Sequence, residues 1–73
     1  MNLAFIGAGR MAEALIEAIV RAELPISPFY VKVSDIDPAR TAALAKQAGI
    51  EIAGSNREAV AWADTVFLCV KPQ

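Results

Sequence analysis

The chain has 73 residues, of which 56% are hydrophobic, and its seven basic and eight acidic side chains give a net charge of −1. This length allows one small domain at most, and such a chain buries only about 60% of the surface that it exposes when unfolded. The longest apolar runs, at residues 59–63 and 66–70, have five residues, whereas a membrane-spanning helix needs about 20. We therefore expect no membrane segment. The charges are balanced and dispersed, so we expect no nucleic-acid partner either.

The chain has no histidine and a single cysteine, Cys69, which lies in an apolar run. No internal disulfide can form, so we expect a cytoplasmic protein in which Cys69 is a buried structural thiol. The absence of histidine excludes serine–histidine and cysteine–histidine nucleophiles and histidine-ligated zinc. We expect no metal site and no catalytic side chain in this chain, so any chemistry must come from a cofactor or from another segment.

The first predicted element is a strand at residues 2–6, an apolar run typical of strands that are covered on both faces. Over residues 11–21 the apolar residues recur with the spacing of a helix. The opposite face of this predicted helix is charged, and Glu17 and Arg21 on it have the spacing of an ion pair. Two prolines end this helix, and residues 29–34 are rich in aromatic and β-branched side chains. We expect a second strand there.

Asp37 and Pro38 predict the start of a second helix, because aspartate caps the free N–H groups and proline fits the first helical position. This helix is expected to continue over residues 39–48 and to end at Gly49 in a left-handed cap. A short third strand is expected at residues 50–53.

Ser55 and Glu58 have the spacing of a capping box, which predicts a third helix at residues 56–63. The run at residues 66–70 is apolar throughout and predicts a fourth strand, covered on both faces. Alternating strands and helices with short connections are typical of parallel sheets. The predicted fold is therefore α/β, a Rossmann-like doubly wound parallel sheet, of which residues 1–73 form the N-terminal part.

A glycine motif follows the first predicted strand: residues 7–12 read Gly-Ala-Gly-Arg-Met-Ala and fit the pattern G-x-G-x-x-[GA]. Gly7 permits a tight turn, Gly9 lets a pyrophosphate approach the backbone, and the small Ala12 lets the helix pack on the strand. Free N–H groups at the helix start would then hold the phosphates. The alternative is that these residues only form a tight turn between the strand and the helix and bind no dinucleotide. The strand–turn–helix context favours dinucleotide binding.

The same fingerprint requires an acidic residue at the end of the second strand, where it binds the ribose hydroxyls. Asp35 lies 23 residues after Ala12, and we favour it over Asp37, whose role as a helix cap already explains it. A carboxylate at this place repels a 2′-phosphate, which favours NADH over NADPH. Arg40 could turn back to meet such a phosphate, so the preference is moderate.

Residues 5–12, Phe-Ile-Gly-Ala-Gly-Arg-Met-Ala, and residues 63–73, which end in Val-Lys-Pro-Gln, resemble the N-terminal domain of pyrroline-5-carboxylate reductases. The resemblance extends over the whole chain. Members of this family reduce the cyclic imine of pyrroline-5-carboxylate to proline with NADH or NADPH. Many members that prefer NADPH have Asn-Arg where this chain has Asp35 and Ile36, which again favours NADH.

The resemblance also implies where the cofactor binds. Asn56 and Lys71 also have alternatives to cofactor binding: Asn56 could have only a structural role at the start of a helix, and Lys71 could only keep the end of a strand solvated. The implied cofactor-binding residues are Gly7, Ala8, Gly9, Arg10, Met11 and Ala12 at the pyrophosphate, Ser34, Asp35 and Ile36 at the adenosine ribose, Asn56 at the adenine end, and Val70, Lys71 and Pro72 near the nicotinamide.

Members of the family continue into a helical C-terminal domain that forms dimers and completes the pocket for a small-molecule substrate. We therefore expect the chain alone not to reduce pyrroline-5-carboxylate; steady NADH oxidation by the purified chain would contradict this. Three alternatives remain: a reductase of the β-hydroxyacid dehydrogenase or F420-linked type, a non-catalytic nucleotide-sensing module, and a methyltransferase with a similar glycine loop.

Overall fold

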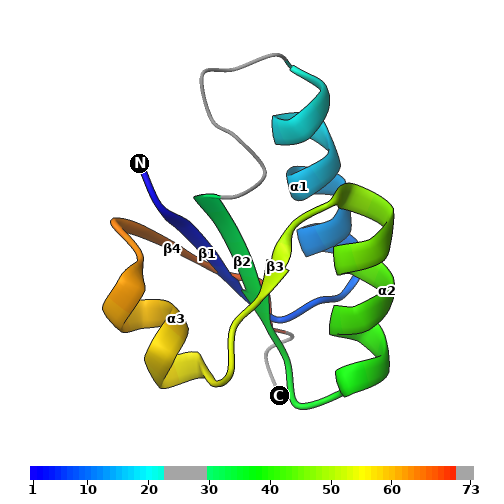
Figure 1. Cartoon of the computed structure of the whole chain (residues 1–73). Coiled ribbons are helices and arrows are strands. Elements are labelled where there is room, and N and C mark those ends of the chain that lie inside the picture. The colour runs from blue at the N-terminus through cyan, green and yellow to red at the C-terminus, as the bar shows by residue number, and fades with distance from the viewer. Residues whose placement is uncertain (23–29, 71–73) are drawn as a thin grey trace.

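The computed structural model describes residues 1–22 and 30–70. In these residues, four parallel strands form one sheet in the order β3-β2-β1-β4, and three helices connect them (Figure 1). The elements are β1 (Leu3–Ile6), α1 (Arg10–Arg21), β2 (Val31–Ser34), α2 (Pro38–Ala48), β3 (Glu51–Ile52), α3 (Asn56–Trp62) and β4 (Thr65–Leu68).

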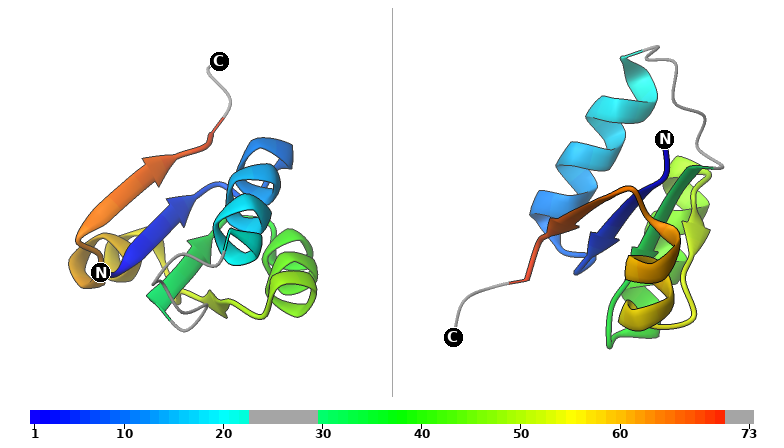
Figure 2. Two further views of the ribbon diagram at one scale, coloured as in Figure 1. Left: turned by 90° about the horizontal axis from the view of Figure 1, so that it is seen from above. Right: turned by 90° about the vertical axis from the view of Figure 1, so that its left-hand side faces the viewer.

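The helices cover both faces of the sheet: α1 and α2 lie on one face and α3 on the other (Figure 2). The side chains of β1 alternate accordingly, because Phe5 packs with Ile16 of α1 and Leu44 of α2, whereas Ala4 packs with Ala59 of α3. From β1 the chain proceeds outward through β2 to β3 and then returns to the opposite side of β1. The predicted doubly wound α/β fold is confirmed, and its strand order reverses beside β1.

The predicted caps are confirmed as well. Asp37 begins α2, where its Oδ1 accepts a hydrogen bond from the N–H of Ala39 at 3.0 Å, and Gly49 ends the helix with a φ of 72°. At α3, the Oγ of Ser55 accepts from the N–H of Glu58 at 3.1 Å. These caps could be predicted from the sequence because a cap depends only on neighbours within one helical turn.

Four expectations were wrong in part. The third strand is shorter than expected, at Glu51–Ile52. The fourth strand begins and ends earlier than expected. It is not covered on both faces: Leu68 is 74% exposed, because in the described residues the helices pack mainly against the other strands and not against β4, at the edge of the sheet. No ion pair forms between Glu17 and Arg21 in the described residues; Glu17 instead accepts a hydrogen bond from Gln47. The second strand begins at Val31, and residue 29 of the expected range lies outside the described residues.

In the described ranges, every helix is too short and too polar to cross a lipid bilayer.

Replacing Ser55 by alanine is expected to lower the free energy of unfolding by about 1 kcal/mol, because the N–H of Glu58 loses its acceptor. Urea unfolding followed by circular dichroism measures this change. Ser55→Asp is the matched control and should retain most of the stability, since aspartate caps equally well. Equal losses in both variants would show that the hydroxyl does not act as a cap.

Candidate functional site

The loop after β1 is shaped by Gly7, which has a φ of 101°. Its N–H donates to the carbonyl oxygen of Ser34 at 2.7 Å, so the loop is attached to the end of β2. On its other side, a Cβ at Gly7 would lie 2.8 Å from the backbone carbonyl oxygen of Cys69, in the segment that follows β4. Gly7 is therefore required both by its backbone conformation and by the close approach of another backbone segment.

The start of α1 is open to solvent. Gly9 is the N-cap residue, no side chain caps the helix, and a Cβ at Gly9 would meet no atom within 4 Å. The first N–H with a helical acceptor is that of Glu13, which donates to the carbonyl oxygen of Gly9. For the N–H groups of Arg10 and Met11, residues 1–22 and 30–70 provide no acceptor. These free donors and the positive end of the helix dipole favour an anion at this place.

Ala12 is fully buried against the sheet, as the motif predicts for a position that must be small.

The carboxylate of Asp35 binds two backbone N–H groups. Its Oδ2 accepts from Ala8 at 2.7 Å and its Oδ1 accepts from Asp37 at 2.8 Å. These two hydrogen bonds, with a smaller contribution from the charge of Arg40, hold the pKa of Asp35 below its ordinary value despite partial burial. Asp35 is therefore ionised near neutral pH and fixes the glycine loop to the start of α2. The N–H of Ala8, which the sequence assigned to the pyrophosphate, donates to this carboxylate.

The lowered pKa of Asp35 predicts a stability that depends on pH. The folded state resists protonation more than the unfolded state, so the stabilisation is complete above about pH 4 and is lost as pH falls through the lower, folded-state pKa. Urea unfolding of the wild type and of Asp35→Asn across this range measures it. The stability of Asp35→Asn should fall less steeply with acid, whereas parallel profiles would contradict the assignment.

Ser34 and Asn56 come together although 22 residues separate them. The buried hydroxyl of Ser34, at the end of β2, donates to Oδ1 of Asn56, the first residue of α3, at 2.6 Å. Because the amide oxygen is used in this way, the amide nitrogen of Asn56 is left as the donor for a ligand. Asn56 is thus a helix start, as the alternative interpretation has it, and also a direct partner of Ser34.

A groove of about 900 Å³ lies in front of the glycine loop, at the carboxyl end of the sheet. Its walls are the loop and first turn of α1, the residues after β2, one side of α2 and the segment after β4. Open α/β sheets bind ligands at such a place, beside the reversal of strand order. Of the residues predicted for the site, the groove is lined by Ala8, Gly9, Arg10, Met11, Asp35, Ile36 and Val70.

The remaining predicted residues have other positions. Gly7, Ala12, Ser34 and Asn56 do not line the groove but lie beside its wall, and Lys71 and Pro72 lie outside the described residues. The sequence pointed to Arg40 but not to the other residues of the wall formed by α2, which are Ala43, Leu44 and Gln47. Their spacing of three and four residues is that of a single helix face, which is the signal by which they could have been found.

Exposed apolar side chains border the groove: Ile36 is 98% exposed, Met11 65% and Val70 60%. They offer apolar surface beside the free N–H groups of α1. A ligand with a charged centre and flat, apolar ends matches this distribution.

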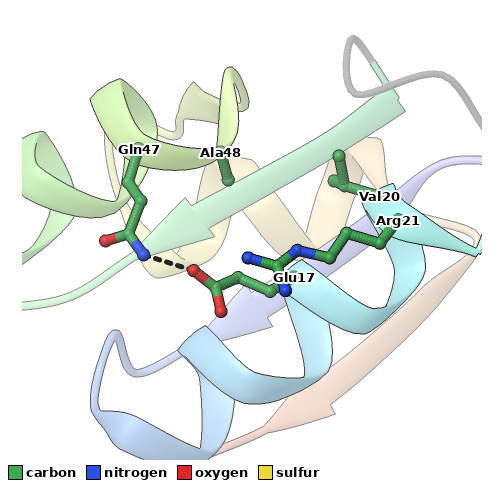
Figure 3. A pocket seen from close by; sticks show the side chains of 5 residues that line it. All are labelled: Glu17, Val20, Arg21, Gln47 and Ala48. Atoms are coloured by element: carbon green, nitrogen blue, oxygen red, sulfur yellow. Dashed lines mark hydrogen bonds between the residues drawn. The ribbon is translucent and has the colours of Figure 1, made fainter.

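A second, smaller hollow of about 170 Å³ lies between α1 and α2 (Figure 3). Glu17, Val20 and Arg21 line it from α1, and Gln47 and Ala48 line it from α2. The Nε2 of Gln47 donates to Glu17 across the hollow, and this hydrogen bond links the two helices. The hollow lies toward the C-terminal ends of both helices and shares only Gln47 with the lining of the groove, so we interpret it as a helix contact rather than a ligand site.

Neither a metal site nor a reactive thiol is evident in residues 1–22 and 30–70. These residues contain no group of three or more acidic or cysteine side chains that could hold a metal ion. Burial raises the pKa of the Cys69 thiol, so this side chain remains protonated near neutral pH and is a poor nucleophile. Its backbone carbonyl, which faces Gly7, is the part of Cys69 that shapes the site.

Comparison with known proteins finds similarity along almost the whole chain. The family model described as NADP oxidoreductase, coenzyme F420-dependent, matches residues 2–73. Among curated proteins, the pyrroline-5-carboxylate reductase of Pseudomonas aeruginosa is 42% identical over 72 residues, which are 99% of this chain and 26% of that protein. The enzyme of the same name from Corynebacterium melassecola is 35% identical over the same shares of the two chains.

The fold comparison agrees with the sequence comparison. A solved structure of a pyrroline-5-carboxylate reductase from Coxiella burnetii superimposes with a TM-score of 0.86 and 27% identity, over 97% of this chain and 26% of that chain. The resemblance expected from residues 5–12 and 63–73 is therefore confirmed along almost the entire chain. The chain spans about a quarter of the length of these relatives.

Proposed function

Because the chain belongs to the family of coenzyme F420-dependent NADP oxidoreductases, we propose that its groove binds NAD(P)H and serves a pyrroline-5-carboxylate reductase. The names of its relatives support the reductase activity. One structural observation carries the cofactor assignment: the open space at Gly9 lies before the free N–H groups that begin α1. A pyrophosphate needs both close backbone approach and such donors.

The proposed cofactor lies along the groove, with its pyrophosphate at the loop after β1. The pyrophosphate is bound by the loop of residues 7–12, chiefly by the N–H groups after Ala8, since that of Ala8 donates to Asp35. The adenosine ribose lies against Asp35 and Ile36, which line the groove beside the buried Ser34, and the amide nitrogen of Asn56 donates to the adenosine end. The nicotinamide lies near Val70, Lys71 and Pro72.

We assign a moderate preference for NADH to Asp35 and Ile36. The ionised carboxylate of Asp35 repels a 2′-phosphate. Ala8 donates to one of its oxygens and Asp37 to the other, and a carboxylate has further lone pairs for the ribose hydroxyls. The neighbouring Ile36 is almost fully exposed and offers no positive charge. Discrimination at the ribose thus depends on repulsion more than on a dedicated phosphate ligand.

The reaction proposed for the whole protein is the reduction of the cyclic imine pyrroline-5-carboxylate to proline. When bound, NAD(P)H supplies the hydride for this step. The residues of this chain bind the cofactor and orient it along the groove, and none of them is assigned a catalytic role. The substrate pocket and self-association are assigned to a helical domain beyond residues 1–73, which form the N-terminal part of the dinucleotide-binding domain, in a cytoplasmic enzyme.

Titration of the isotope-labelled chain with NADH, NADPH and S-adenosylmethionine tests the cofactor assignment. The amide signals of Gly9 and Asp35 should shift with both nicotinamide cofactors, and that of Gly49, outside the groove lining, should not. A response to S-adenosylmethionine alone would instead favour a methyltransferase. Equal affinity for NADH and NADPH would contradict the preference assigned to Asp35.

A further inference from the structure

We propose that Lys32 is a positioning residue for the cofactor, although it does not line the groove. Lys32 holds Trp62, the last residue of α3, against β2. In this way it sets where α3 lies on the sheet, and with α3 the amide of Asn56 at the adenosine end of the groove. The inference rests on the proposed NAD(P)H binding.

Lys32 lies on the face of β2 that α3 covers, between two partners. Its Nζ is 4.5 Å from the centroid of the Trp62 ring and 3.9 Å from Oε2 of Glu51. The side chain of Lys32 is 26% exposed and that of Glu51 is 52% exposed. A cation–π contact becomes stronger when it is shielded from water, whereas an exposed ion pair contributes little. Trp62 is therefore the partner through which Lys32 can hold a helix in place.

The helix α3 is attached to β2 at both of its ends. Lys32 and Ser34 are two residues apart in β2, so their side chains lie on the same face of the sheet. The Oγ of Ser34 donates to Asn56, the first residue of α3, and the Nζ of Lys32 contacts the ring of Trp62, the last. Two residues of strand span about 7 Å and six residues of helix about 9 Å, so both attachments can form together.

The middle of α3 contributes less to its position. Ala59 is fully buried and packs with Ala4 and Ile6 of β1. Contacts between alanines let the helix approach the sheet closely, but they bury little apolar area and interlock few side chains. A helix of seven residues is also too short to be stable by itself. The position of α3 therefore depends on the attachments at its ends.

Asn56 is the residue through which a shift of α3 reaches the cofactor. It is exposed, and because its Oδ1 accepts from Ser34, its amide nitrogen remains as the donor. At the other end of α3, Asn2 donates to the carbonyl oxygen of Trp62 at 3.2 Å. Loss of the Lys32 contact therefore loosens this end of the helix without detaching it. The helix can then turn about Ser34 and change the direction of the Asn56 amide.

Dissociation constants of the full chain for NADH test the inference. Lys32→Met keeps an unbranched side chain but removes its charge, and it should raise the Kd roughly three- to fivefold, the loss expected for a partly shielded cation–π contact. Lys32→Arg should bind NADH as the wild type does, since a guanidinium also packs on an indole. Lys46→Met is the matched control: it removes the same charge from an exposed position of α2 outside the groove lining, and should leave the Kd within about 1.5-fold.

The same substitution in an Asn56→Ala background separates positioning from a purely structural role. Without the amide, α3 has no donor to direct, so Lys32→Met should there change the Kd by less than about 1.5-fold. An equal loss in both backgrounds would show that Lys32 acts through charge or stability alone, and would overturn the inference.

A spectroscopic measurement tests the link from Lys32 to Asn56 without cofactor. The side-chain amide signals of Asn56 should shift in Lys32→Met and stay in place in Lys46→Met; unmoved signals in Lys32→Met would overturn the inference. If the wild type binds no NADH, the proposed function fails, and this inference with it. If it binds NADH and Lys32→Met leaves the Kd unchanged, only this inference fails.

Discussion

Replacing Gly7 by alanine is expected to lower the free energy of unfolding by about 3 kcal/mol or more, enough to unfold a small domain in large part. Two costs add. A φ of 101° is strained for any residue with a Cβ, and that Cβ would lie 2.8 Å from the carbonyl oxygen of Cys69. Cys69 cannot withdraw freely, because its N–H donates to the carbonyl oxygen of Ile6 at 2.8 Å.

Gly49→Ala is the matched control for this substitution. Gly49 also has a positive φ, of 72°, but a Cβ there would meet no atom within 4 Å. Its replacement should therefore cost only the backbone term, about 1–2 kcal/mol. Thermal and urea unfolding of both variants separate the two contributions. If Gly7→Ala were no less stable than Gly49→Ala, the contact with the Cys69 backbone would have no energetic weight.

The loop of residues 7–12 shows which features of the site can be predicted from the local sequence. The motif at residues 7–12 predicts a tight turn, and the positive φ of Gly7 confirms it. The second reason for glycine at this position is a backbone segment 62 residues further along the chain. Such a contact depends on the placement of β4 beside β1, which no local pattern contains. The type of element could be predicted, whereas its packing neighbours could not.

For the fourth strand, the sequence predicted more burial than the structure has. Its apolar run predicted a strand covered on both faces, but Val66 and Phe67 are only partly buried and Leu68 is exposed. Hydrophobicity shows which side chains can be buried, whereas the helices that pack on each face of the sheet decide which of them are. The central strand β1, with a neighbour on each side and helices on both faces, is buried as predicted.

The site residues that lie at strand ends could be predicted from the sequence. Their hydrogen-bond partners and packing neighbours could not. Asp35 was expected at the end of β2 and is found in the groove, but its hydrogen bond to Ala8 spans 27 residues. Apart from Arg40, the wall formed by α2 was missed for a related reason. Helical spacing shows that Arg40 and Leu44 share a face, but the crossing of α2 over the sheet determines that this face borders the groove.

Replacing Gly9 by alanine is expected to reduce the affinity for NADH and NADPH by about ten- to a hundredfold, which is the loss of one or two charge-assisted hydrogen bonds to a pyrophosphate. The physical reason is the open space before α1: a methyl group at Gly9 would occupy the volume through which the phosphates approach the backbone. Isothermal titration calorimetry with each cofactor measures the loss.

The same variant should fold almost as well as the wild type, and this distinguishes Gly9 from Gly7. The φ of Gly9 is −82°, which any residue adopts, and no atom lies within 4 Å of its Cβ position. The change at the N-cap should therefore cost less than about 1 kcal/mol. A variant that stays folded and loses both cofactors would tie the glycine loop to the pyrophosphate. Unchanged affinity in a folded Gly9→Ala chain would mean that the phosphates do not approach the backbone here, and the proposed binding mode would be wrong.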